Sequence, residues 1–306
     1  MRTRSVVLQG VLAVGAVLAA AAVASRPPEG APGEVVVWDA PVNGLQWVRH
    51  EEPSGWVELY REPSEGGALW LRWSTPPRAL RANELAGPLF ARFAPLKASR
   101  ALGVLDAAHL AEVGLKDSRR ALRLGFTGSE QRFTLAAPAS GWRGPYLRRP
   151  TDGEVFLLSA SLLPDLEGTA WRLVDRTLHT FGAGDADTLT VTVEGATRAV
   201  RLAGPGVPPP EEAVRRWHER LTLLAPAAGD FLGRGEVPPG GEPREAFRVD
   251  YARGTTRLGH LSVGRGADGT VYARTEHTPG WVRLAPWADS LLEEARRLSL
   301  TPPRPP

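Results

Sequence analysis

The histidines are the first residues to consider for chemistry, because imidazole is a general base near neutral pH and the commonest metal ligand. They are His50, His109, His179, His218, His260 and His277. No two of them are four residues apart, and the His-Glu-x-x-His zinc motif does not occur. His109 and His218 fall in expected helices beside Glu residues, where we interpret them as surface or hydrogen-bonded histidines. The pattern predicts no metal site.

A covalent nucleophile has no signature in the sequence either. The chain contains no Cys, which excludes disulfides, thiolate metal ligands and a Cys nucleophile, as well as lipid attachment through an N-terminal Cys. The Gly-x-Ser-x-Gly motif is also absent. Serine catalysis stays open at this level, because a triad assembles in space from distant residues. We therefore predict that the protein is not an enzyme, with no catalytic, cofactor-binding or metal-binding residues and no cofactor.

Two short motifs have plain structural interpretations. Residues 264–269 (GRGADG) have the spacing of a dinucleotide-binding loop, but such a loop must lead into a helix. The strand-like residues 271–274 follow instead, and Asp268 with the next Gly is typical of a hairpin turn. Asp185 and Asp187 lack the other ligands of a calcium loop, so we predict that they are turn residues.

Residues 1–25 predict a membrane-targeting segment. Arg2 and Arg4 precede an apolar run that extends to Ala24. A cleaved signal peptide fits the basic start and the small residues at 22–24. An uncleaved anchor fits the length, since about 20 residues span a bilayer, and we expect membrane retention. In both cases the arginines stay in the cytoplasm and the remainder is exported, which predicts the bacterial cell envelope, either anchored in the inner membrane or released into the periplasm.

The exported part is expected to contain an internal repeat, which should be sought first because it decides the fold. A spacing of 126 residues relates Gly114 to Gly240, Leu135 to Leu261, Tyr146 to Tyr272, and residues 155–158 to 281–284. We predict an α+β fold of two similar lobes, each an antiparallel sheet with packed helices, preceded by one hydrophobic N-terminal helix. The expected divisions are a linker at 26–34, lobes at 35–180 and 181–300, and a Pro-rich tail at 301–306.

Apolar periodicity places the elements within each lobe. Alternation at 69–73 and at 189–193 predicts half-buried strands. Helical stripes are expected from Asn83, with Pro88 awkwardly placed, and at 214–224, while Asp106 should cap a short helix that ends at Gly114. Residues 156–171 predict a strand and a helix that close the first lobe, and 287–298 a final helix with Trp287 on its apolar face.

A family resemblance covers about residues 70–178, and more weakly the second lobe. Residues 98–102 (ASRAL), residues 110–115 (LAEVGL), the following hairpin, the Tyr146 strand and residues 155–158 (VFLL) resemble the bacterial domain-of-unknown-function family numbered 4340. The chain departs from the family pattern at Val113, at Ser118 and at 137–138 (AP). The resemblance implies an anchored envelope protein that is often encoded beside ABC-transporter parts of the gliding-motility type. It implies no catalytic residue.

Composition narrows the partner classes. The net charge is only +3, and no clustered basic stripe is visible, so nucleic-acid binding is not expected. The chain has 10 Trp, of which Trp47, Trp56, Trp70 and Trp73 are close in sequence. Exposed, they would stack on sugar rings, whereas burial in the core is the usual role of such rings.

The sequence therefore predicts a non-catalytic accessory or scaffold protein of an envelope complex. The membrane, through residues 1–25, and a protein are the expected partners, and the resemblance suggests an ABC-transporter component as that protein. A periplasmic glycan- or ligand-binding module is the alternative, and an envelope hydrolase is a third possibility. An exposed Trp row over a groove would favour glycan binding, and a broad apolar patch would favour a protein partner.

Overall fold

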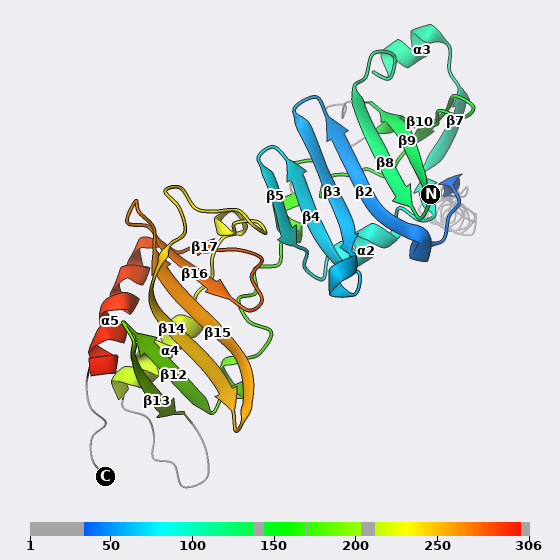
Figure 1. Cartoon of the computed structure of the whole chain (residues 1–306). Coiled ribbons are helices and arrows are strands. Elements are labelled where there is room, and N and C mark those ends of the chain that lie inside the picture. Colours follow the sequence, from blue (N-terminus) through cyan, green and yellow to red (C-terminus); the bar gives the residue numbers. More distant parts are fainter. Residues whose placement is uncertain (1–33, 137–143, 169, 203–211, 301–306) are drawn as a thin grey trace, which may run out of the picture.

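We describe the protein from a computed structural model, which describes residues 34–136, 144–168, 170–202 and 212–300. The predicted α+β class is wrong. The structure is mostly β, with 42% strand against 21% helix, and its strands form three antiparallel sheets with few helices. Figure 1 shows a larger lobe built from the first half of the chain and a smaller lobe built from the second half.

The larger lobe is built on a nine-stranded sheet with the order β5-β4-β3-β2-β8-β9-β10-β11-β7. Its strands are β2 (Leu45–Glu52), β3 (Gly55–Glu62), β4 (Ala68–Ser74), β5 (Pro77–Arg81), β7 (Arg100–Val104), β8 (Arg120–Phe126), β9 (Ser129–Leu135), β10 (Tyr146–Arg148) and β11 (Glu154–Leu157). A separate pair joins β1 (Val35–Trp38) to β6 (Leu96–Ala98). The two α-helices among the described residues of this lobe, α2 (Ala86–Ala91) and α3 (Ala107–Glu112), have only six residues each.

The smaller lobe is built on a six-stranded sheet with the order β13-β12-β14-β15-β16-β17. Its strands are β12 (Thr188–Val193), β13 (Ala196–Arg201), β14 (Arg244–Arg253), β15 (Thr256–Arg265), β16 (Val271–Thr275) and β17 (Val282–Arg283). The helices α4 (Glu212–Thr222) and α5 (Asp289–Leu300) contact each other and cover one face of this sheet (Figure 1).

The two sheets share an order of strands but not a size. The run β3-β2-β8-β9-β10-β11 in the larger sheet and the whole of the smaller sheet are connected in the same way along the chain. Strands β4, β5 and β7 and the β1–β6 pair have no counterpart in the smaller sheet. The smaller lobe in turn has helices about twice as long as those of the larger lobe. The prediction of two similar α+β lobes is therefore wrong as stated.

The predicted helices of the larger lobe fail where the sequence interrupts them. The expected helix at the end of residues 156–171 is mostly irregular, with one 3-10 turn at Ala170–Leu173, because Pro164 and Gly168 disfavour a continuous helix. Helix α2, which contains Pro88, ends at Ala91 after only six residues. The short helix capped by Asp106 is confirmed: its carboxylate accepts a hydrogen bond from the His109 amide at 2.9 Å.

One continuous cluster of buried apolar side chains extends through both lobes. At their junction the edge strand β5 meets the loop after α4. The Arg78 guanidinium donates two hydrogen bonds to the Glu236 carboxylate, at 2.8 and 2.6 Å, and the Arg234 amide donates to the Ala79 carbonyl at 3.2 Å. The second lobe therefore covers an edge that would otherwise be open for strand pairing.

The predicted N-terminal hydrophobic helix, most of the linker and the tail lie outside the described residues. Within the ranges that the structure describes, no helix has the length and apolar character needed to cross a membrane.

Candidate functional site

The structure separates the two helical histidines that the sequence grouped together. His109 lies on the surface of α3, with Nδ1 2.9 Å from an Asp106 oxygen, as predicted. His218 does not lie on the surface: its side chain is buried on the inner side of α4, and Nε2 has no hydrogen-bond partner.

The predicted hairpin is confirmed, since β15 pairs with β16 and the Asp268 carboxylate accepts a hydrogen bond from the Thr270 amide in the connecting turn. Among the described residues, no group of His, Asp and Glu side chains has metal-binding geometry.

A second buried histidine lies at the end of strand β2. His50 and Glu52 are two residues apart, so they project to the same face of the sheet, which here is the core face. Arg120 starts the neighbouring strand β8, and Glu167 comes from the irregular segment after β11. We call His50, Glu52, Arg120 and Glu167 the His50 cluster.

Arg120 holds this cluster together. Its guanidinium donates to the Glu52 carboxylate and lies 3.7 Å from Glu167 Oε1. The His50 ring, only 1% exposed, has Nδ1 4.0 Å from Glu52 and Nε2 3.8 Å from Glu167 Oε1, both too long for hydrogen bonds. His50 Nε2 and Arg120 Nε are buried without partners. Unpaired buried polar atoms are rare and call for an explanation.

Burial also changes the acid–base behaviour of the cluster. Burial, with a smaller contribution from the Arg120 charge, lowers the pKa of His50 to about 4. Burial raises the pKa of Glu167. The charge of Glu52 adds to that shift, and the charge of Arg120 opposes it. At neutral pH the His50 ring is therefore uncharged.

A small cavity of about 130 Å³ adjoins these side chains. It is lined by His50, Glu52, Ser54, Gly55, Trp56, Val57, Trp73, Ser74, Thr75, Leu166 and Glu167. Ser54 and Thr75 are exposed, so the cavity opens between the turn joining β2 to β3 and the turn joining β4 to β5. The Trp73 ring is buried and stacks on Trp171, with 4.7 Å between centroids. The cavity thus has polar groups at its floor and apolar side chains in its walls.

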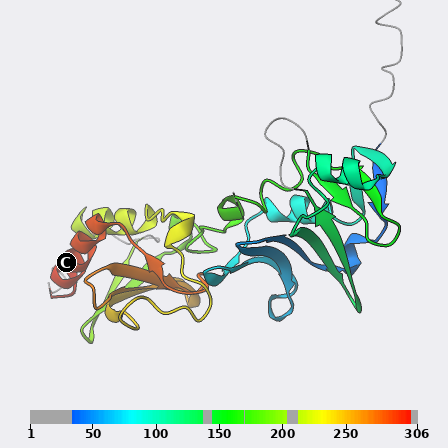
Figure 2. The same cartoon turned by 90° about the horizontal axis from the view of Figure 1, so that it is seen from above.

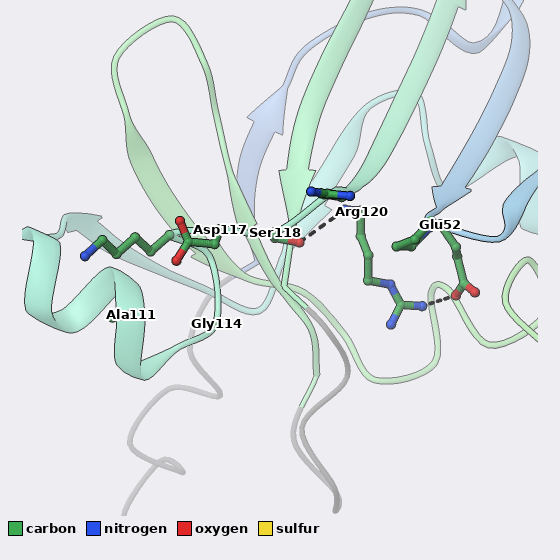
Figure 3. A pocket seen from close by; sticks show the side chains of 9 residues that line it. Glu52, Ala111, Gly114, Asp117, Ser118 and Arg120 are labelled. Carbon is green, nitrogen blue, oxygen red and sulfur yellow. Dashed lines mark hydrogen bonds and ion pairs between the residues drawn. The ribbon is translucent and has the colours of Figure 1, made fainter.

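A wider hollow of about 580 Å³ lies on the other side of Glu52, between α3 and the start of β8. Figure 3 shows Glu52 joined to the Arg120 guanidinium, and the Arg120 amide joined to the Ser118 hydroxyl. Lys116 and Asp117 lie at the solvent side of this hollow. Because it is open and its charges are of both signs, we assign no ligand to it.

The outer face of the larger sheet carries a stack of arginines and aromatic rings. We call it the Arg–Trp face, and it comprises Trp47, Arg49, Glu51, Trp56, Glu58, Tyr60, Trp70, Arg72, Arg81, Arg123, Arg132 and Arg234. The Arg49 guanidinium lies 4.3 Å from the centroid of Trp56, and Arg234 from the second lobe lies 4.2 Å from that of Trp70. Such contacts stabilise both partners by about 0.5–1 kcal/mol when exposed and more when desolvated.

The most exposed arginines of this face lie over carboxylates, and Glu130, which pairs with Arg123, is exposed beside them. Glu58 is 1% exposed and accepts hydrogen bonds from Arg49 and Arg72, whereas the Arg72 side chain is 47% exposed. Arg132 is 62% exposed above Glu51, which is 19% exposed. Helix α2 packs into the core through Ala86, Leu89 and Phe90 and therefore lies on the other side of the sheet; Figure 2 shows this short helix, in cyan, on one side of the strands.

These contacts decide the role of the four clustered tryptophans. Trp70 and Trp73 are buried, and Trp47 and Trp56 are half-buried beneath arginines. Within the described ranges only Trp171 and Trp287 count as exposed, and they belong to different lobes. The row of free rings expected for a glycan-binding surface is not present in this part of the chain.

Sequence reasoning missed both the His50 cluster and the Arg–Trp face. Alternation from Val48 through His50 to Glu52 was available as a signal, because it places two titratable groups on a core face. Arg120 and Glu167 reach the cluster only through the pairing of β2 with β8 and the path of an irregular segment.

Comparison of the chain with protein-family models, curated proteins and solved structures found no match. The resemblance to the family numbered 4340 therefore stays a prediction.

Proposed function

We propose that this chain is a non-catalytic accessory or scaffold protein of the bacterial cell envelope, and that it binds the acidic surface of a protein partner through the Arg–Trp face. The N-terminal segment would hold it at the membrane. By the family resemblance alone, the partner would be a component of an ABC-type transporter.

The observation that supports this proposal is the layering of the Arg–Trp face. Trp and Arg are the residues most enriched among those that dominate binding energy at protein interfaces. Here the rings and the arginines are already ordered by stacking and by ion pairs to Glu51 and Glu58. Ordering side chains before binding lowers the entropy cost of association. Because the guanidinium groups of Arg72, Arg132 and Arg234 are the most exposed charges of this face, an acidic surface is the complementary partner.

Reversing the charge of the exposed arginines tests this proposal. In Arg72→Glu/Arg132→Glu, recovery of the cross-linked partner from membranes should fall at least about tenfold, since 1.4 kcal/mol corresponds to a tenfold change in affinity. The partner should be identified by mass spectrometry and its contact surface should be acidic. The complex should also weaken as salt is raised, because exposed charges are screened.

The matched control is Arg172→Glu/Arg216→Glu, which reverses two arginines of similar or greater exposure outside the face. It should leave recovery within about twofold of wild type. His109→Ala and Asp268→Ala should likewise leave the complex intact. Equal losses in the face variant and in the control, or none in either, would refute the assignment of the Arg–Trp face.

One observation favours a second candidate, a ligand-binding module. The cavity beside His50 contains a buried ring nitrogen without a partner, which a bound ligand would satisfy.

A further inference from the structure

We propose that the cavity beside His50 binds a primary ammonium group, held between His50 Nε2 and the Glu167 carboxylate. This inference names the ligand class of the second candidate and is independent of the Arg–Trp face.

The charge of the cavity floor favours a cation. Glu52 and Glu167 contribute two carboxylates, and Arg120 supplies one guanidinium to both. The His50 ring is uncharged and therefore adds no second positive charge beside the two glutamates. Arg120 is shared and lies closer to Glu52 than to Glu167, so a cationic ligand beside Glu167 would add a second counter-charge in a site where burying charge is costly unless it is paired.

The geometry fits a nitrogen that donates several hydrogen bonds. His50 Nε2 and Glu167 Oε1 are 3.8 Å apart and both line the cavity. A single donor atom at about 2.9 Å from each of them closes this gap. An ammonium group has three N–H donors and no acceptor. Its third donor would face the hydroxyl groups of Ser54, Ser74 or Thr75, which line the same cavity.

Size and walls limit what is attached to the ammonium group. A volume of about 130 Å³ leaves room for the ammonium and a short methylene chain but excludes a large ring system. The Trp73, Val57 and Leu166 side chains supply apolar contact for methylenes. Because the cavity opens at two turns, the rest of the ligand would extend into solvent. A free alkylamine and a lysine side chain of a peptide both have this chemistry.

The test is binding of ethylammonium to the full chain, followed by the shift of the His50 ring resonances in NMR, which are assigned from a His50→Gln variant. A dissociation constant on the order of 1 mM is expected for so small a ligand. A lysine-containing tripeptide forms the second arm: tighter binding by the tripeptide points to a peptide source, and equal or weaker binding points to a free amine.

Three controls make the outcome decisive. Glu167→Gln keeps the shape of the side chain and removes its charge, so it should weaken ethylammonium binding at least about tenfold. Glu130→Gln on the outer face should leave binding unchanged, and both variants should retain the wild-type circular dichroism spectrum. Acetate should not shift the ring. No His50 shift at about 100 mM ethylammonium, or equal binding in Glu167→Gln, would overturn the proposal. Because partner recovery through the Arg–Trp face is measured separately, failure of one proposal leaves the other standing.

Discussion

Replacing Trp217 with Ala is expected to lower the free energy of unfolding of the smaller lobe by about 3–5 kcal/mol, the usual cost of truncating a buried Trp. Trp217 is 1% exposed on the inner side of α4. Its ring contacts Phe247 of β14 at 5.6 Å between centroids, and its Nε1–H donates to the Leu291 carbonyl in α5 at 3.1 Å. A single side chain therefore joins both helices to the sheet, and its loss leaves a cavity and removes the hydrogen bond to α5.

Trp287→Ala is the matched control, because its ring is 47% exposed just before α5. Surface substitutions are usually worth about 0.5 kcal/mol or less. Urea unfolding should be followed by far-ultraviolet circular dichroism, which keeps a common signal when a Trp is removed. Since two lobes need not unfold together, the smaller-lobe transition is the one to compare. A midpoint for Trp217→Ala equal to that of Trp287→Ala would contradict this account of the α4 packing.

The same tryptophans show which features of the structure the apolar periodicity of the sequence can predict. The stripe containing Trp217 predicted α4 and its buried face correctly, because an 11-residue helix repeats its apolar positions several times. Trp287 was assigned to the apolar face of the last helix, yet it lies in the preceding 3-10 turn and is exposed. Element boundaries depend on local capping and turn geometry, which a stripe does not specify.

The α+β prediction failed for a different reason. Apolar spacing in short segments is ambiguous, and the irregular part of residues 156–171 buries Leu162, Leu163 and Leu166 without forming a helix. These leucines are buried by tertiary packing, whereas their spacing was interpreted as the apolar face of a helix. Strands β4 and β12 were predicted from alternation, but the pairing that places β4 in one sheet with β2 and β8 is non-local and has no sequence signal.

The Arg–Trp face could not be predicted from the sequence for the same reason, because its residues come from strands and lobes that are distant along the chain. The sequence places Arg72 and Glu58 on different strands, and only the register of β3 with β4 sets them opposite each other. Arg234 reaches Trp70 from the other lobe, across 164 residues of chain. Counting charges predicted a nearly neutral protein but did not show that exposed arginines such as Arg72 and Arg132 lie over buried or half-buried glutamates on one face.

The second large effect is expected on acidification, through His50. Its pKa is about 4 in the folded protein, against an ordinary value near 6.5 in an unfolded chain. Between these two pH values the unfolded chain binds a proton that the folded protein does not, so stability falls as pH falls. One pKa unit corresponds to 1.36 kcal/mol. The loss from His50 alone between pH 6.5 and pH 4 should therefore be about 3 kcal/mol.

Glu167 acts in the opposite direction within the same cluster. Its raised folded pKa means that the folded protein binds a proton before the unfolded chain does as pH falls, which partly restores stability. Carboxylates with lowered folded pKa values, such as Asp175 and Glu276, lose stability on acidification in wild type and in the variants alike. Their contribution cancels when profiles are subtracted, because neither residue belongs to the His50 cluster.

The measurement is the free energy of unfolding of wild type, His50→Gln and Glu167→Gln from pH 7 to pH 4. His50→Gln should lose about 3 kcal/mol less than wild type over this range, because it has no proton to gain on unfolding. Glu167→Gln should lose more than wild type, because the opposing uptake is removed and the charge of Arg120 is less balanced. Deviations from the wild-type profile in opposite directions in these two variants are the signature of a buried neutral His50 facing a desolvated carboxylate. Parallel profiles in all three proteins would show that His50 is hydrated and titrates normally.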